Sequence, residues 1–282
     1  MWLLKVARPG FWLTSIWFYL LPLGRRVVWT EWTFWLGLFY VTFPLGLLIY
    51  GWNDLFDSDN DRANPRKDTF LFGARPTSEQ IARLPRWIAL AQIPFVICFL
   101  LLLGGKSLAW WAAVVAGTAL YNWPRVGFKN WPLVDLLNQV SYVLVFVLGS
   151  WLNGVPQLPW FTFVFGALFA MHSHLFGEIM DRGIDLAAGR RTTAGVFGMV
   201  PAKWLLACIL ASEAVLIGCC ARDLWIAAAL ACGAFFFLLD AALIWRAQPY
   251  AGWQMRLFFL GWNAAALFSI PWVWQTATLA AM

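Results

Sequence analysis

Residues 53–61, Asn53-Asp54-Leu55-Phe56-Asp57-Ser58-Asp59-Asn60-Asp61, place four aspartates at the end of a hydrophobic run. If the helix that carries the run continues, Asp54, Asp57 and Asp61 stand at positions i, i+3 and i+7 and share one face. Three carboxylates on one face repel one another unless a cation neutralises them, and Mg2+ takes oxygen ligands. The stretch therefore predicts a divalent-metal site at the end of a membrane-type helix.

A second acidic cluster has similar spacing much later in the chain. Residues Glu178, Asp181 and Asp185 follow another apolar run and are three and four positions apart. On a helix these carboxylates again share one face. Two facing acidic helix ends can hold two or more Mg2+ ions around a diphosphate. The two clusters together predict diphosphate chemistry at a membrane surface.

The composition indicates an integral membrane protein. Of the 282 residues, 62% are hydrophobic and only 12% are charged, whereas soluble domains have about a quarter charged residues. The five cysteines all lie in apolar runs without the spacing of metal ligands. We interpret them as small buried hydrophobic side chains, which leaves the redox compartment open.

Stretches of about twenty apolar residues, enough to cross a bilayer, occur nine times. They lie near residues 11–29, 33–56, 87–104, 107–123, 132–152, 159–180, 203–221, 224–245 and 256–276. The N-terminal segment and the even-numbered loops of this map hold 16 of the 20 Lys and Arg residues. The positive-inside rule then places the N-terminus and both acidic clusters on the cytoplasmic side. Topology thus explains the net charge of +6 without a nucleic acid partner.

Basic and aromatic residues next to the acidic clusters are candidates for phosphate binding. Arg66 and Lys67 follow the first cluster closely, and a guanidinium can bind two phosphate oxygens at once. Tyr121 and Lys129 flank the loop after the fourth span, where an ordinary cytoplasmic turn is the alternative interpretation. After the second cluster, residues 189–193 supply two arginines and two threonines, and their glycine is expected to end the helix.

Ionisable side chains inside predicted spans mark functional sites by default, although a hydrogen bond between helices is their commoner role. His172 is favoured for contact with an acceptor because it lies nine residues before Asp181 on the same predicted helix. The roles of Glu213 and Asp240 stay open. The full set is Asp135, His172, His174, Glu213 and Asp240.

These motifs resemble those of the UbiA superfamily of intramembrane prenyltransferases. Asn53-Asp54-x-x-Asp57-x-x-x-Asp61 is similar to the first aspartate motif of that family, and Asp181-x-x-x-Asp185 is similar to the second. Arg8-Pro9 resembles the family's opening. The loop after the fourth span resembles the family only in part, because Arg125 and Gly127 stand where proline and arginine are usual. That departure weakens the case for an aromatic-acid acceptor.

The resemblance implies an all-α fold, in which nine transmembrane helices surround a central cavity within a single domain spanning residues 1–282. It implies transfer of a prenyl group from an isoprenyl diphosphate donor to a lipophilic acceptor, with Mg2+ or Mn2+ as cofactor. The active site would face the cytoplasm from a bacterial or archaeal inner membrane. The implied metal ligands are Asp54, Asp57, Asp61, Glu178, Asp181 and Asp185. The implied catalytic residues are Asp54, Asp57, Asp61, Asp181, Asp185 and Lys129. The implied substrate-binding residues are Arg8, Asn53, Arg66, Lys67, Tyr121, His172 and Arg191.

Three tracts look more like the carotenoid-elongating branch of that superfamily, which includes lycopene elongases. They are Asn64-Pro65-Arg66-Lys67, Met171-His172 and Asp185-x-x-x-Gly189-x-Arg191-Thr192-Thr193-Ala194. A carotenoid such as lycopene is therefore the first-ranked acceptor, and an aromatic quinone precursor or a tetrapyrrole alcohol is the alternative. A divalent cation transporter is an alternative of another class, although transporters usually place their sites near the bilayer midplane. A non-catalytic prenyl-lipid binding protein would not need intact metal motifs.

Overall fold

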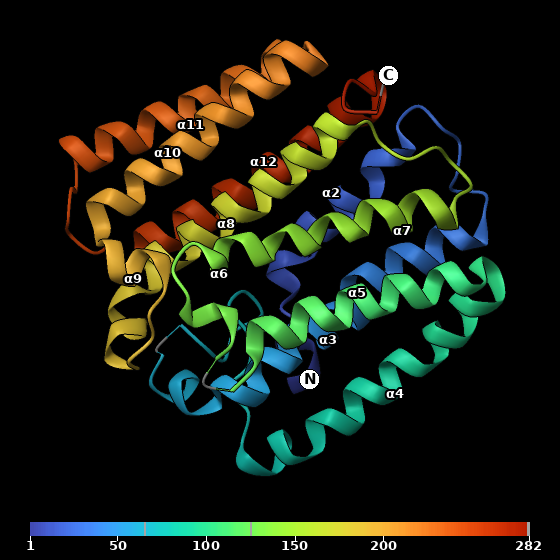
Figure 1. The fold of residues 1–282 in the computed structure, drawn as a ribbon, viewed down its shortest axis with the longest axis horizontal. Coiled ribbons are helices and arrows are strands. Elements are labelled where there is room, and N and C mark those ends of the chain that lie inside the picture. The colour runs from blue at the N-terminus through green and yellow to red at the C-terminus, as the bar shows by residue number, and fades with distance from the viewer. Residues whose placement is uncertain (65, 125, 281–282) are drawn as a thin grey trace. The chain divides into compact units, whose positions relative to one another are not determined.

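The computed structural model describes residues 1–64, 66–124 and 126–280, without the side chains of residues 58–63. This part of the chain is helical and contains no strand (Figure 1). The elements are α1 (Trp2–Val6), η1 (Pro9–Phe11), α2 (Trp12–Leu20), η2 (Leu21–Leu23), α3 (Trp32–Ala63), α4 (Ser78–Leu103), α5 (Gly105–Asn122), η3 (Phe128–Asn130), α6 (Val134–Leu137), η4 (Asn138–Val143), α7 (Leu144–Leu152), α8 (Trp160–Ala187), α9 (Thr193–Phe197), α10 (Met199–Leu216), η5 (Ile217–Ala221), α11 (Leu224–Ala242) and α12 (Gly252–Thr276). The predicted all-α fold class is confirmed.

Seven helical segments of the described chain are long and apolar enough to cross a membrane. They are Trp32–Asp57, Ser78–Leu103, Val134–Leu152, Trp160–Ala187, Met199–Ala221, Leu224–Ala242 and Gly252–Thr276. The other two predicted spans fall on α2 and α5. The first of them, predicted over residues 11–29, is helical only to Leu23, because Gly24 turns to an extended conformation and Arg25 has a φ of 60°.

The two helices that carry the acidic motifs are the longest in the described chain. The 32-residue α3 continues through Asp54 and Asp57, and the 28-residue α8 continues through Asp181 and Asp185. The predicted continuation of both helices beyond the apolar runs is therefore confirmed. The helix α8 ends where Gly189 takes a φ of +72°, a conformation that glycine adopts without strain.

The chain divides into two compact units. The first comprises Met1–Pro124, Leu144–Gln157 and Asn263–Ala277, and the second comprises Arg125–Val143, Leu158–Trp262 and Thr278–Met282. In the first unit α2 crosses α3 closely, since a Cβ at Gly37 would clash with the hydroxyl of Tyr19. In the second unit α8, α10 and α11 share a core that includes Leu175, Leu206 and Ala234. Each acidic motif thus belongs to a different unit.

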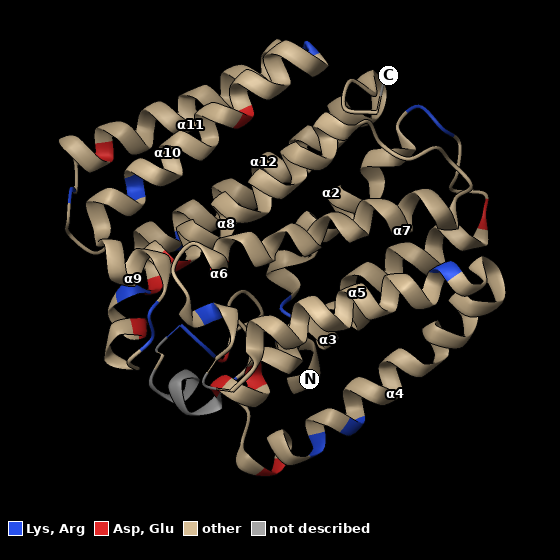
Figure 2. Cartoon of the chain, viewed as in Figure 1, with Lys and Arg blue, Asp and Glu red and all other residues tan. Residues whose placement is uncertain are grey.

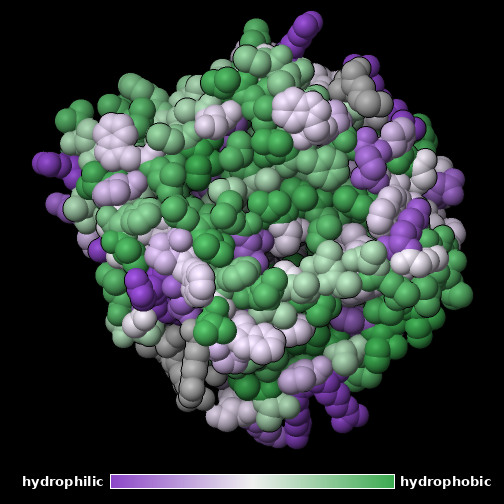
Figure 3. Space-filling model, in the orientation of Figure 1, coloured by the Kyte–Doolittle hydropathy of each residue, from purple (hydrophilic) through white to green (hydrophobic). Residues whose placement is uncertain are grey.

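Large apolar side chains cover the outer faces of the long helices. Leu101 on α4 is 82% exposed, Trp225 on α11 is 74% exposed and Phe268 on α12 is 77% exposed. Apolar surface covers much of the face seen in Figure 3, while Figure 2 shows that charged residues gather mostly at helix ends and in loops. Exposed apolar area of this extent suits contact with lipid.

The prediction that all cysteines are buried is wrong. Cys208, Cys219, Cys220 and Cys232 are exposed, and Cys98 is partly exposed. An apolar run does not distinguish a helix face that packs on protein from one that faces lipid, since both favour apolar residues.

Candidate active site

The first acidic motif forms a buried carboxylate site at the end of α3. Asp54 is fully buried and Asp57 is 3% exposed, one helical turn apart. Arg8 Nη2 donates to Asp54 Oδ1 at 3.0 Å, and Lys67 Nζ lies 3.4 Å from the same oxygen. Two cations that come from distant parts of the sequence therefore neutralise one buried aspartate, as burial of a charge requires. Asp61, the third predicted member, lies outside the described side chains.

Backbone conformation brings Arg8 to this site. Arg8 itself has a φ of 48°, between α1 and the turn η1, and its guanidinium lies over the ring of Tyr50 at 4.6 Å. The loop beside it turns back at Gly73, whose φ is +102°. A Cβ at Gly73 would lie 3.0 Å from Arg8 Nε, so a side chain at this position would crowd the arginine, and glycine also adopts this φ without strain.

Asn53 connects the motif to α5. Its Nδ2 donates to Asp57 Oδ2 at 2.8 Å and to Asn122 Oδ1 at 3.0 Å. Asn122 is buried at the end of α5 and donates in turn to the carbonyl of Thr118. The prediction for this loop named the half-buried Tyr121, whereas the described contact to Asn53 comes from its neighbour Asn122. A polar residue at the end of an apolar helix, two positions before Pro124, was the available signal.

The other predicted basic residues lie in different surroundings. The Arg66 guanidinium lies over the ring of Phe72 at 5.0 Å, and its backbone N–H donates to Asn64 Oδ1 at 3.0 Å. Lys129 is 9% exposed within η3, which belongs to the second unit. Arg191 is exposed beyond the end of α8.

The second acidic motif lies along the last turns of α8. Asp185 is buried and pairs with Arg190 Nη1 at 3.3 Å, while the Arg190 backbone N–H donates to the Asp185 carbonyl at 2.8 Å. Asp181 is partly exposed one turn earlier. The arginine that folds back onto the motif is therefore Arg190, whereas the sequence-based prediction of a substrate-binding residue named its neighbour Arg191.

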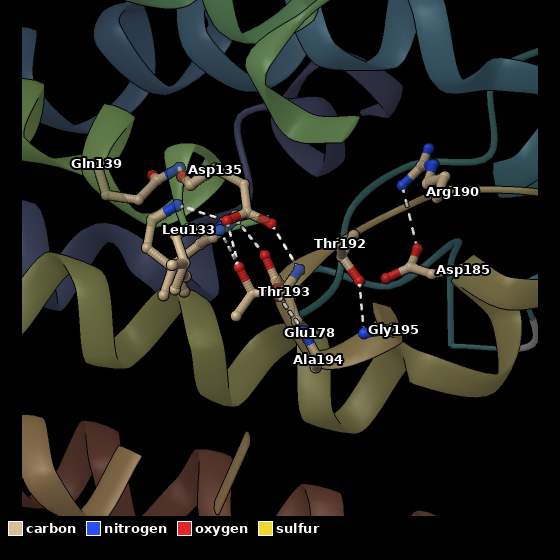
Figure 4. A network of polar contacts seen from close by, with 12 residues as sticks. Leu133, Asp135, Gln139, Glu178, Asp185, Arg190, Thr192, Thr193, Ala194 and Gly195 are labelled. Carbon is tan, nitrogen blue, oxygen red and sulfur yellow. Dashed lines mark hydrogen bonds and ion pairs between the residues drawn. The ribbon is translucent and has the colours of Figure 1, made fainter. Parts of the chain in front are cut away.

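Glu178 belongs to a buried network that fixes the chain after α8 (Figure 4). Its Oε2 accepts from the backbone N–H of Ala194 at 3.0 Å, and its Oε1 lies 3.3 Å from His174 Nε2. Asp135, from α6, accepts from the backbone N–H of Thr193 at 2.8 Å and from its hydroxyl at 2.5 Å. The network ties α6 and α9 to α8, so the loop with Arg190 returns to the motif.

The Asp135–Thr193 contact was not predicted from the sequence. The sequence identifies the two residues separately, Asp135 as an ionisable residue in a predicted span and Thr193 as part of the tract that follows the second acidic cluster. Thr192, beside it, caps α9 by accepting from the Gly195 N–H at 3.2 Å. This threonine capping signal marks the start of a helix and could have been found.

The donor atoms of the two motifs suit a hard divalent cation. Asp54, Asp57, Asp181 and Asp185 offer carboxylate oxygens, the ligands that Mg2+ prefers. Within the described side chains, which leave out Asp61, no three Asp, Glu, His or Cys groups converge as a metal-binding cluster. Each motif thus offers part of a ligand set, from its own unit.

A family model for the UbiA prenyltransferase family matches residues 11–263. A protein named lycopene elongase/hydratase from Corynebacterium glutamicum is 27% identical over 276 residues, covering 92% of this chain and 93% of that protein. A protein of the same name from Haloarcula japonica is 34% identical over 161 residues, covering 56% of this chain and 53% of that protein.

The fold is similar to that of a UbiA homolog from Archaeoglobus fulgidus. The structure bound to DMAPP and Mg2+ has a TM-score of 0.69 at 18% identity and covers all of both chains. The structure bound to GPP and Mg2+ has a TM-score of 0.67 at 19% identity, over 97% of this chain and 99% of the other. With the family model matching most of the sequence, the chain belongs to the UbiA prenyltransferase family and is a prenyl-transferring enzyme.

Proposed function

We propose that this enzyme transfers a prenyl group from an allylic isoprenyl diphosphate to a linear carotenoid such as lycopene, with Mg2+ as cofactor. The observation that carries the diphosphate half of the proposal is the buried Asp54 with Arg8 and Lys67 on one of its oxygens. Acidic and basic groups gathered at one helix end suit a ligand made of divalent cations and phosphate oxygens.

The proposed metal ligands are the aspartates of the two motifs, Asp54, Asp57, Asp61, Asp181 and Asp185, with Glu178 beside the second. Bound Mg2+ would polarise the diphosphate and stabilise the charge that develops as it departs. Mn2+ is expected to substitute, since it also accepts oxygen ligands. Two structures of the Archaeoglobus homolog contain Mg2+, one with GPP and one with DMAPP, and they support this assignment by analogy.

The basic residues are proposed to bind and orient the donor. Arg8 and Lys67 already lie at Asp54, beside which the metal-bound diphosphate is proposed to bind. Arg66, Lys129 and Arg191 are the further candidates, with Asn53 and Tyr121 as hydrogen-bonding groups. Cations at these positions stabilise the leaving diphosphate, and aromatic side chains of the apolar interior exclude water from the allylic cation.

The acceptor is proposed from two kinds of evidence. Relatives that align over most of this chain are named lycopene elongase/hydratase. In addition, Gly127 stands in the loop after α5 where an arginine is usual in the motif that this loop resembles. A linear polyene has no carboxylate, so its binding needs no such cation.

The acceptor assignment predicts the outcome of two assays on one purified preparation. Dimethylallyl diphosphate with lycopene is expected to give a product heavier by one or two prenyl units, as read by mass spectrometry. A longer prenyl diphosphate with a hydroxybenzoate or homogentisate is expected to give none. Product in the second assay alone would reject the carotenoid acceptor and leave prenyl transfer intact.

We further propose nine membrane spans in one domain over residues 1–282, with the N-terminus and the active site at the cytoplasmic face of a bacterial or archaeal inner membrane. The distribution of Lys and Arg supports this orientation. A cysteine at Glu79 is then expected to react only with reagents inside the cell, and one at Gln157 only with reagents outside. Both positions are exposed. Labelling of the two from the same side would overturn the topology.

A further inference from the structure

A buried pair of ionisable residues joins α8 to α10, deeper along α8 than the second acidic motif. His172 Nδ1 lies 2.6 Å from Glu213 Oε1. His172 is 2% exposed and Glu213 is fully buried. The proposed donor chemistry gives Glu213 no role, and charged groups at membrane depth are costly. The burial of two ionisable side chains at this depth therefore points to a role beyond donor binding.

One nitrogen of the imidazole has no partner in the described part of the chain. His172 Nε2 is buried and makes no hydrogen bond there, and the same holds for Glu213 Oε2. An unsatisfied buried polar atom costs about 1–3 kcal/mol. A pair that served only to join two helices would be expected to satisfy these atoms. When Glu213 accepts the Nδ1–H, the lone pair of Nε2 is left to accept a proton.

Two aromatic rings pack against the histidine. The ring of Phe169 lies 5.1 Å from the imidazole and the ring of Trp262 also lies 5.1 Å from it. These two rings are 5.0 Å from each other. Aromatic faces stabilise a neighbouring carbocation and exclude water. The imidazole is thus next to groups that suit a hydrocarbon cation.

The position along α8 fits a second reaction step. His172 precedes Asp181 by nine residues, which is about 14 Å along a helix axis. The reacting groups must follow one another in space from the metal ligands to the base. The diphosphate lies at the motif, its allylic carbon comes next, and the acceptor double bond lies between that carbon and the base. Such a base must come within about 3 Å of the atom that loses the proton.

We propose that His172 is the base that takes a proton from the acceptor, and that Glu213 is the positioning residue that holds the imidazole. This inference rests on the proposed function. The allylic C–O bond breaks and diphosphate leaves, and the acceptor's double bond forms the new C–C bond. The resulting cation loses a proton from the adjacent carbon to His172 Nε2, and those electrons form the product's double bond. Glu213 then faces the imidazolium, whose proton is later released to water.

The test uses a His172→Gln variant and measures two products of the reaction, inorganic diphosphate and the elongated alkene. Removal of a general base costs about 10²–10⁴-fold in the step that it serves. We expect diphosphate release to stay within about threefold of the wild-type rate, because no donor-binding group changes. The yield of elongated alkene per diphosphate is expected to fall at least about tenfold, with alcohols from water capture in its place.

A structural role for His172 would lower both products together, and an unchanged ratio would overturn the proposal. Wild-type enzyme that forms only the hydrated alcohol would overturn it as well, since no C–H proton is then removed. Absence of any acceptor-dependent diphosphate release in the wild type would instead reject the proposed function itself.

Glu213 is tested by two substitutions and a matched control. Glu213→Gln keeps the size of the side chain but cannot balance an imidazolium, so the alkene yield per diphosphate is expected to fall. Glu213→Asp is expected to restore part of that yield. The control is Gln92→Leu, because Gln92 also makes buried interhelix hydrogen bonds, to Tyr40 and to the Pro44 carbonyl. The control is expected to leave the product ratio unchanged, and equal effects at Gln92 and Glu213 would reject a positioning role.

Discussion

Asp57→Asn and Asp181→Asn are each expected to lower diphosphate release from dimethylallyl diphosphate by about 10³-fold. Metal-ion stabilisation of a leaving group is worth several kcal/mol, and each 1.36 kcal/mol is about tenfold in rate. Each motif offers only part of a ligand set, so the loss of one carboxylate charge leaves the metal shell open. The measurement is steady-state release of inorganic diphosphate at saturating Mg2+, with lycopene present.

Asparagine matches aspartate in size, so both variants are expected to give the same elution profile as the wild type in detergent. Glu79→Ala is the matched control, because within the described part of the chain Glu79 pairs with Arg83 on the exposed surface of α4. Such pairs contribute about 0–1 kcal/mol, and neither fold nor rate should change. Wild-type rates in Asp57→Asn or Asp181→Asn would exclude these aspartates from metal binding.

Among the substitutions proposed here, Asp240→Asn is expected to lower the free energy of unfolding most. Lys203 Nζ lies 2.8 Å from Asp240 Oδ2, and both side chains are fully buried. The same amine donates to the Arg246 carbonyl at 2.8 Å, and the Tyr250 hydroxyl donates to Asp240 Oδ2. Burial and this hydrogen bond raise the pKa of Tyr250 well above its ordinary value, so the hydroxyl stays a donor.

Removal of one partner leaves a buried, unpaired ammonium, which costs about 3–5 kcal/mol. Thermal unfolding in detergent, followed by loss of the monodisperse peak, measures the difference. The double variant Lys203→Met with Asp240→Leu removes both charges and is expected to recover most of the loss. A double variant as unstable as Asp240→Asn would show that the hydrogen bonds to the loop after α11, and not the unpaired charge, dominate.

The long helices could be predicted from sequence because their signals are local. The apolar runs of about twenty residues predicted the membrane segments, and the aspartate spacing predicted that α3 and α8 continue beyond them. Gly189 predicted the end of α8. The shortened first helix was not predicted, since the apolar residues 27–29 beyond Arg25 and Arg26 extended the predicted span, whereas the helix ends at Leu23. Hydropathy measures polarity and does not register a change in backbone direction.

The partners of the site residues could not be predicted, because each contact joins positions far apart in the chain. Arg8 meets Asp54 across 46 residues, Asp135 meets Thr193 across 58, and His172 meets Glu213 across 41. Spacing places side chains on one helix face, but which helices pack together depends on the whole core. The sequence therefore predicted the candidate site residues better than the residues that contact them.

Metal dependence of diphosphate release tests the central claim most directly. Purified enzyme in liposomes would receive dimethylallyl diphosphate and lycopene with Mg2+, then EDTA, and then excess Mg2+ or Mn2+. We expect release of diphosphate and a heavier carotenoid in Mg2+, no detectable release in EDTA, and recovery with either metal. Undiminished release of diphosphate in EDTA, or no release under any of these conditions, would contradict metal-dependent prenyl transfer.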